Sequence, residues 1–145
     1  MDNHFRKTVL RLPFEMVLGQ LRSELYREGF EVSSVIDLRV PHSDPDGISS
    51  RKYKIMVAYH PFLYTEMKRF SPFEGIILPC VISIIETYPG ETAVVPYNAT
   101  ESIAQEIQSP SLQNLATEAT KRLRRAIQML EKEQIGTPDL ITSWG

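Results

Sequence analysis

The chain has 145 residues, of which 42% are hydrophobic and 23% are charged, and its formal net charge at pH 7 is -2. This size suits a single domain that folds around one core without disulfides or a structural metal. The acidic balance, with a pI of about 5.9, argues against a protein that neutralises nucleic-acid phosphates. We therefore expect one globular domain with no nucleic-acid partner.

The longest apolar run is too short to cross a membrane. It comprises residues 75–85 (GIILPCVISII) and is interrupted by Pro79, whereas a spanning helix needs about 20 residues. The N-terminal segment carries charges at Asp2, Arg6 and Lys7 without an apolar signal region, and a single cysteine cannot form an internal disulfide. We expect a cytoplasmic protein with no membrane segment.

Residues 5–40 predict a strand, a helix and a second strand. The alternation in residues 5–12 suits a strand, after which Pro13 stands where a helix can begin. Apolar residues then recur at steps of three and four, and Gly29 supplies a left-handed stop. This stripe contains Phe14, Val17, Leu18, Leu21 and Leu25. In residues 31–40 a two-residue period places four apolar residues on one face: Val32, Ile36, Leu38 and Val40.

The middle of the chain predicts three more strands and a short helix. A polar loop at 41–51 leads into a third strand at 52–60, and residues 62–70 suit a short helix. A fourth strand at 76–87 and a fifth at 91–97 are joined by a Pro-Gly turn. In the third strand, alternate side chains share one face: Tyr53, Ile55, Val57 and Tyr59.

The fourth strand departs from simple alternation. Val81 and Ile85 lie on one face and Ile82 and Ile84 on the other, so both sides of this strand need cover. Helices would cover one side, and either sheet curvature or a second subunit would cover the other. The second alternative leads us to expect a homodimer.

A long helix is predicted after Ser109, which can cap it, with Pro110 in its first turn. The apolar stripe of this helix would dock on the sheet and contains Leu112, Leu115, Ala116, Ala119, Leu123, Ala126, Ile127 and Leu130. The Gly-Thr-Pro sequence at 136–138 predicts the end of the helix. We expect a single domain over residues 1–134 and a C-terminal tail over 135–145.

The element order β-α-β-β-(short α)-β-β-α predicts the fold class. Hairpin-length links among the later strands favour antiparallel pairing. We therefore expect an α+β fold with a curved antiparallel five-stranded sheet and helices packed on one face.

Cys80, the only cysteine, is the first candidate for chemistry. A free cysteine is usually a buried small hydrophobe, whereas a reactive one needs exposure and a lowered pKa. Pro79 cannot donate a ladder hydrogen bond and belongs at the beginning of a strand, which places Cys80 at the mouth of that strand. His60 ends the third strand beside Tyr59. We expect Tyr59, His60, Pro79 and Cys80 to line a ligand-binding cleft at this mouth.

The sequence contains none of the usual motifs for metal binding, phosphate binding, serine hydrolysis or dinucleotide binding. One cysteine and three dispersed histidines give no zinc pattern. There is no Walker A loop, no serine elbow and no dinucleotide-binding fingerprint. We expect no metal and no cofactor.

A basic cluster on the last helix lies opposite its apolar stripe. It contains Lys121, Arg122, Arg124 and Arg125. Glu118 precedes Arg122 by four residues, a spacing at which helical side chains pair. We interpret the cluster as a solvated, ion-paired face, in preference to a nucleic-acid patch.

Several short steps resemble one family, the domain-of-unknown-function 302 family, over about residues 13–97. The steps are Glu28-Gly29-Phe30, Tyr59-His60-Pro61, Leu78-Pro79-Cys80 and the Pro89-Gly90 turn. The resemblance implies a fold similar to that of the TATA-box-binding protein, with helices on the convex side of the sheet, and it does not imply DNA binding. The family often has cysteine or asparagine where this chain has His60, and asparagine where it has Val81. These departures remove polar companions from a shared thiol site.

Three functions remain open. The first is a non-enzymatic, homodimeric module that binds a small molecule or a partner protein in the cleft. The second is a thiol-dependent redox or transfer activity, with Cys80 as nucleophile and His60 as its base. The third is a structural subunit of a larger assembly. The sequence identifies no substrate, and so it does not decide whether the chain is an enzyme.

Overall fold

The computed structural model describes residues 6–38, 51–69 and 79–144, with side chains as far as residue 133. Five strands and four helices occur in these ranges. They are β1 (Thr8–Leu10), α1 (Phe14–Arg27), β2 (Glu31–Asp37), β3 (Tyr53–Tyr59), α2 (Pro61–Lys68), β4 (Cys80–Tyr88), β5 (Glu91–Asn98), α3 (Ala99–Glu106) and α4 (Pro110–Trp144). Most of the predicted loop at 41–51 and the start of the predicted fourth strand lie outside the described residues.

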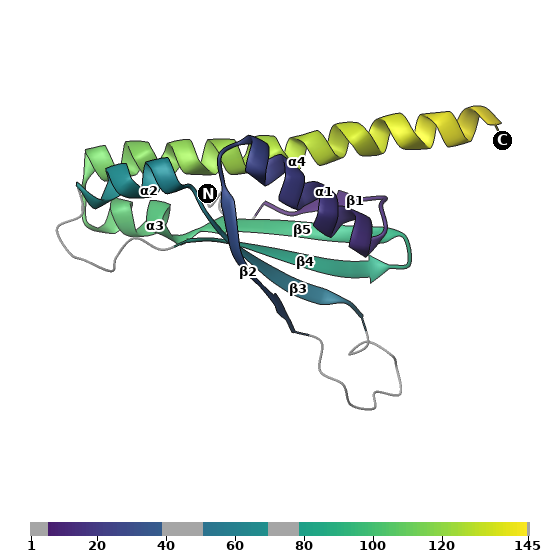
Figure 1. The fold of residues 1–145 in the computed structure, drawn as a ribbon, viewed down its shortest axis with the longest axis horizontal. Coiled ribbons are helices and arrows are strands. Elements are labelled where there is room, and N and C mark those ends of the chain that lie inside the picture. The colour runs from purple at the N-terminus through teal and green to yellow at the C-terminus, as the bar shows by residue number, and fades with distance from the viewer. Residues whose placement is uncertain (1–5, 39–50, 70–78, 145) are drawn as a thin grey trace.

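The strands form one antiparallel sheet in the order β1-β5-β4-β3-β2. Strands β1 and β2 occupy opposite edges, so α1, which joins them, crosses the sheet. Helices α1 and α4 lie over the same face, and α2 and α3 lie near one end of the sheet (Figure 1). The predicted α+β class, the five-stranded antiparallel sheet and the packing of helices on one face are confirmed.

Helix α1 shows how local sequence signals produce the fold. It begins directly after Pro13, and its apolar stripe packs into the core. Its end is fixed by Gly29, whose φ of 95° is accessible to glycine without strain. The Phe30 N–H donates to the Leu25 carbonyl at 2.9 Å, closing the helix. This termination turns the chain into β2.

The predicted alternation of β2 is wrong after its second residue. A β-bulge between Val32 and Ser34 inserts one extra residue opposite β3. An extra residue shifts every later side chain to the other face of the sheet. Val32 and Val35 therefore pack against the core, whereas Ile36 lies on the face away from the helices and is 47% exposed.

The core lies between the sheet and the two long helices α1 and α4. In β4, Ile82 and Ile84 are fully buried beneath the helices, while Val81 and Ile85 on the opposite face are half-buried. The predicted cover of that second face is therefore only partial within one chain. The side chains completely removed from solvent include Leu10, Val17, Leu21, Leu25, Ile82, Ile84, Val94, Leu123, Ala126 and Leu130.

Helix α3 was not predicted from the sequence. Asn98 caps it, because the side-chain oxygen of Asn98 accepts a hydrogen bond from the Thr100 N–H at 3.2 Å. Together with α2 and the first turns of α4, it encloses a second apolar cluster beyond the end of the sheet. This cluster contains Leu63, Met67, Ala104, Leu112, Ala116 and Ala119.

Helix α4 begins as predicted but extends further. The Ser109 hydroxyl accepts a hydrogen bond from the Leu112 N–H at 3.3 Å, which caps the first turn. The helix continues to Trp144, so the helix end predicted at 136–138 is wrong. A proline inside a helix removes one backbone hydrogen bond but does not by itself stop the helix. The division into a domain at 1–134 and a tail at 135–145 stays a prediction.

The length of α4 does not make it a membrane span. As far as residue 133, its buried side chains follow one stripe, and mostly charged and polar residues occupy the rest of its surface. Within the described ranges, no helix combines the length and the apolar character that crossing a membrane requires.

Candidate functional site

The four residues predicted to line a cleft do meet at one end of the sheet. Ala58 pairs with Cys80 in the β3–β4 register, so Tyr59, the last residue of β3, and His60 after it lie at the end of the sheet where Pro79 precedes β4. Their side chains diverge, however. Cys80 belongs to the buried core, His60 contacts the ends of helices, and Tyr59 bonds across the far face of the sheet.

Cys80 is packed as a core residue. Its side chain lies on the helix-covered face and is 4% exposed. Burial raises the pKa of its thiol to about 12, and the negative charge of Glu101 adds to the increase. The thiol therefore stays protonated at neutral pH. Among the described residues, no hydrogen bond joins it to His60.

A buried polar network lies beside Cys80, and sequence reasoning missed it. Asn98 pairs with Cys80 in the β4–β5 register and donates from its amide to the Ala116 carbonyl at 2.9 Å and to the Thr120 hydroxyl at 3.0 Å. The Thr120 hydroxyl in turn donates to Glu101 at 2.9 Å. These bonds tie β5 and α3 to α4. The network satisfies its polar groups internally, which indicates a structural role.

His60 is also committed to structure. Its Nδ1 accepts a hydrogen bond from the Leu63 N–H at 3.3 Å, so the ring proton of the neutral form is on Nε2. Nε2 then donates to the Glu28 carbonyl at 3.0 Å. The imidazole thereby caps α2 and binds the end of α1, and its ring meets Phe30 edge to face at 5.3 Å.

Arg122 lies against the same imidazole. Its Nη1 is 3.2 Å from His60 Nε2, which already carries a proton, so this contact brings two donors together. Burial lowers the pKa of His60, and the positive charge of Arg122 lowers it further. His60 is therefore neutral at physiological pH. A neutral imidazole with both nitrogens engaged is not available as a catalytic base.

The basic cluster on α4 is largely ion-paired, as predicted. Arg122 bonds Glu118 at 2.8 Å, and this hydrogen bond lowers the pKa of the Glu118 carboxyl. Lys121 approaches the same carboxylate at 4.0 Å. Arg125 bonds Glu28 at 3.0 Å, joining α4 to the end of α1. The Arg125–Glu28 pair links two helices, whereas both pairs with Glu118 lie within α4.

Tyr59 is the predicted residue on the face of the sheet opposite α1 and α4. Its hydroxyl donates to a Glu31 carboxylate oxygen at 2.9 Å, and this hydrogen bond raises the pKa of Tyr59. Its ring meets Tyr64 edge to face at 6.1 Å. Tyr59 thus sits at the end of β3 on the uncovered side of the sheet.

The uncovered side of the sheet is an extended apolar surface, which we call the open face. Paired residues in an antiparallel register share a face, so the register identifies its members. They are half-buried or exposed, apart from the small Ala93. The open face comprises Val9, Glu31, Ser34, Ile36, Tyr53, Ile55, Val57, Tyr59, Val81, Ser83, Ile85, Tyr88, Glu91, Ala93, Val95 and Tyr97.

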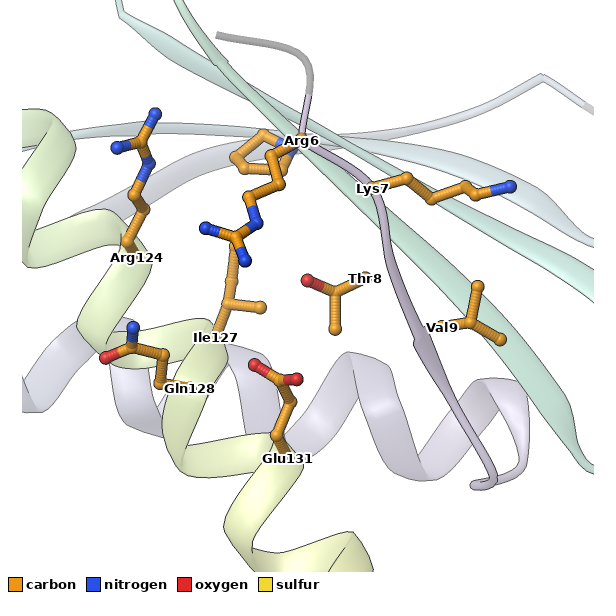
Figure 2. Close-up of a pocket in the computed structure, with 9 residues that line it drawn as sticks. Arg6, Lys7, Thr8, Val9, Arg124, Ile127, Gln128 and Glu131 are labelled. Carbon is orange, nitrogen blue, oxygen red and sulfur yellow. The ribbon is translucent and has the colours of Figure 1, made fainter. Parts of the chain in front are cut away.

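A hollow of about 200 Å³ lies elsewhere, between the β1 edge of the sheet and α4. Arg6 reaches over it from the segment before β1, and Arg124, Gln128 and Glu131 approach from α4 (Figure 2). Ile127 forms part of its apolar wall. We call this site the β1–α4 hollow. Sequence reasoning missed it because its two arginines are more than a hundred positions apart.

Metal binding has no support in the described part of the chain. No group of three histidine, cysteine, aspartate or glutamate side chains there lies close enough together to hold an ion.

Comparison with known proteins gives a family and a fold. A family model described as "Domain of unknown function DUF302" matches residues 5–130. The chain is also similar to the crystal structure of an uncharacterized conserved DUF302 protein from Bacillus stearothermophilus, with a TM-score of 0.71 and 16% identity. That match covers 88% of this chain and 98% of the other. At this identity the likeness concerns the fold. No curated protein sequence matches.

Proposed function

The chain belongs to the DUF302 family, a domain of unknown function. From the geometry we propose that it is a non-enzymatic binding module, and that it forms a homodimer through the open face. The observation that carries this proposal is the continuous apolar surface on the uncovered side of the sheet. The TATA-box-binding-protein-like fold implied by the resemblance stays a prediction.

The composition of the open face favours a protein partner. Its centre is aliphatic, with Ile55, Val57 and Val81 on adjacent strands, and Ile36 beside them is 47% exposed. Soluble monomers seldom leave so large a contiguous apolar patch in contact with water. No lysine or arginine belongs to the open face as defined, so it lacks the cations that a nucleic acid requires.

A second copy of this chain is the partner that best fits the surface. An apolar, nearly uncharged sheet face is complementary to itself, and two such faces pack about 10 Å apart in sandwich proteins. Five strands spaced about 4.8 Å apart, each about seven residues long, present roughly 550 Å². Two subunits would bury roughly 1,100 Å², near the lower limit for a specific interface. We therefore expect a reversible dimer of moderate affinity.

The residues predicted to form a cleft contribute unequally to this proposal. Tyr59 lies on the open face and would contact the second subunit at the rim of the interface. Pro79 stands at the same end of the sheet, before β4. His60 and Cys80 point away from the open face and contribute through the fold.

The thiol-dependent alternative is opposed by the surroundings of Cys80. A nucleophilic cysteine needs a populated thiolate and access to its substrate. Here burial raises the thiol pKa to about 12 and leaves 4% of the residue exposed. His60, the proposed base, has both ring nitrogens engaged elsewhere.

The test is the oligomeric state of the purified full chain, measured by sedimentation velocity over a range of concentrations. We expect a concentration-dependent dimer. Ile55→Glu places a charge at the centre of the open face twice per dimer and should yield a monomer with an unchanged circular dichroism spectrum. Met16→Glu is the matched control, because Met16 is an exposed apolar residue on α1. It should still dimerise.

Two outcomes would overturn the proposal. One is a wild-type chain that stays monomeric at every concentration measured. The other is a dimer that Ile55→Glu leaves intact, because this result would place the interface on a different surface. Native mass spectrometry of the same samples gives the subunit count independently.

A further inference from the structure

The β1–α4 hollow has the size of a small-metabolite site. Its volume of about 200 Å³ is equivalent to roughly six or seven water molecules at about 30 Å³ each. It is smaller than the sites that hold cofactors or drug-sized molecules, which start at about 300 Å³. A ligand that fills it has a correspondingly small number of non-hydrogen atoms.

The lining of the hollow carries a positive excess. Arg6 and Arg124 contribute two cations, against one carboxylate from Glu131, whereas the Lys7 side chain extends away from the hollow (Figure 2). Arg6 forms no hydrogen bond or ion pair with the described part of the chain, and its guanidinium extends over the hollow (Figure 2). A guanidinium offers a planar fork of N–H donors that matches a carboxylate or a phosphate.

Glu131 discriminates between these two anions. Its carboxylate points into the same hollow from α4 (Figure 2). It would repel a doubly charged phosphate about twice as strongly as a singly charged carboxylate, which offsets the stronger attraction of phosphate to the two arginines. The remaining wall includes Pro96 and Ile127, which offer contact to a short hydrocarbon part.

We propose that the β1–α4 hollow binds a small organic monocarboxylate, with its carboxylate held by Arg6 and Arg124 and its hydrocarbon part against Ile127 and Pro96. This site would be the ligand site of the binding module, so the inference rests on the proposed function in that respect. It does not depend on the open face, because the hollow lies on the helix-covered side of the sheet; Val9, on β1 at the rim of the hollow, is the residue that the two share.

The probe is sodium butyrate, added to the full ¹⁵N-labelled chain in low-chloride buffer at neutral pH while amide shifts are recorded. Saturable shifts are expected at Thr8, Val9, Ile127 and Gln128. Butyramide, which has a similar size and no charge, should give none. Inorganic phosphate should bind more weakly than butyrate, and Glu131→Gln should narrow that difference.

Arg124→Gln supplies the sharpest variant, with Arg125→Gln as its matched control. Losing one charge-assisted contact should weaken butyrate binding about tenfold. Arg125 is the next residue on α4 but bonds Glu28, so its substitution should leave the affinity unchanged. Both variants keep the helix, and each is checked by circular dichroism.

Three results would overturn the proposal: no saturable butyrate shifts, equal shifts with butyramide, or equal weakening by the two arginine substitutions. Repeating the titration on Ile55→Glu separates this inference from the dimer. A wild-type monomer that binds butyrate would contradict the homodimer but not the ligand site. A dimer that does not bind butyrate would contradict the ligand site but not the homodimer.

Discussion

At the level of single side chains, the His60 imidazole joins three helices. It caps α2, bonds the end of α1 and touches Arg122 on α4. Because the ring must be neutral to accept from one N–H while donating to a carbonyl, protonation would break one of these links. The hydrogen bonds of neutral His60 therefore stabilise the fold in a way that depends on pH.

We predict that stability falls as the pH is lowered through the ordinary pKa of histidine. The folded pKa of His60 is lowered, chiefly by burial and next by Arg122, so below pH 6.5 the unfolded chain binds a proton that the folded chain resists. The contribution of neutral His60 to the free energy of unfolding is complete above about pH 6.5. It is lost as the pH falls towards the lower pKa of His60 in the folded chain. Urea unfolding from pH 8 to pH 5 measures it.

The control for this prediction is His60→Asn, which keeps a capping oxygen but does not titrate. The wild type should lose free energy of unfolding faster than this variant between pH 7 and pH 5. His4 and His42 are common to both chains. The pKa of the Glu118 carboxyl is lowered, so its own effect on stability appears at a more acid pH than the effect of His60. Parallel pH profiles would contradict the role assigned to His60.

Gly29 provides a second prediction at this scale. Its φ of 95° disfavours any side chain, and a Cβ at this position would collide with His60 Nε2. We expect Gly29→Ala to lower the free energy of unfolding by about 2–3 kcal/mol, from strain and from the disturbed Glu28 hydrogen bond.

Gly90→Ala is the matched comparison for Gly29→Ala. Gly90 has a similar φ of 82°, but a Cβ at this position would meet no atom within 4 Å, so only backbone strain of about 1 kcal/mol applies. Urea denaturation of the two variants should therefore give clearly different midpoints. Equal losses would show that the contact with His60 has no energetic weight.

At the level of elements, the predictable parts were those fixed by local patterns. Helix α1 has its start, stripe and stop in the sequence, and the β4–β5 hairpin has its Pro-Gly turn. The β2 bulge was not predictable from periodicity, because an inserted residue leaves the apolar pattern intact but changes the face it describes. Helix α3 had a signal that was overlooked, namely Asn98 followed three residues later by Glu101.

The candidate sites were less predictable than the elements. Sequence spacing placed Tyr59, His60 and Cys80 at one end of the sheet, which the register confirms, but side-chain direction decides what they contact. Burial of Cys80 depends on helices that come later in the chain. The β1–α4 hollow arises only when Arg6 meets α4 in the folded protein.

At the level of the whole molecule, the sheet separates two surfaces with different chemistry. The helix-covered side holds the core and, at its edge, the charged β1–α4 hollow, whereas the open face is apolar and nearly uncharged. Ligand binding and self-association therefore use different forces. Added salt should weaken binding of a carboxylate in the hollow far more than it weakens contact between two open faces.

The division into a domain and a tail gives the last prediction. The family match ends at residue 130, which is also the last buried position among the α4 side chains described, as far as residue 133, and the helix beyond it runs clear of the sheet (Figure 1). We expect a chain ending at residue 134 to melt at the temperature of the full chain. Differential scanning calorimetry of both chains measures this.

A chain ending at residue 122 is the contrasting truncation. It lacks four core side chains, Leu123, Ala126, Ile127 and Leu130. The three larger ones each stabilise the fold by roughly 1.5–3 kcal/mol on burial, and their summed loss of roughly 5–9 kcal/mol is comparable to the whole stability of a small domain. This chain should not fold. If the chain ending at residue 134 also melted many degrees lower than the full chain, residues 135–145 would belong to the domain and the boundary would have to be moved.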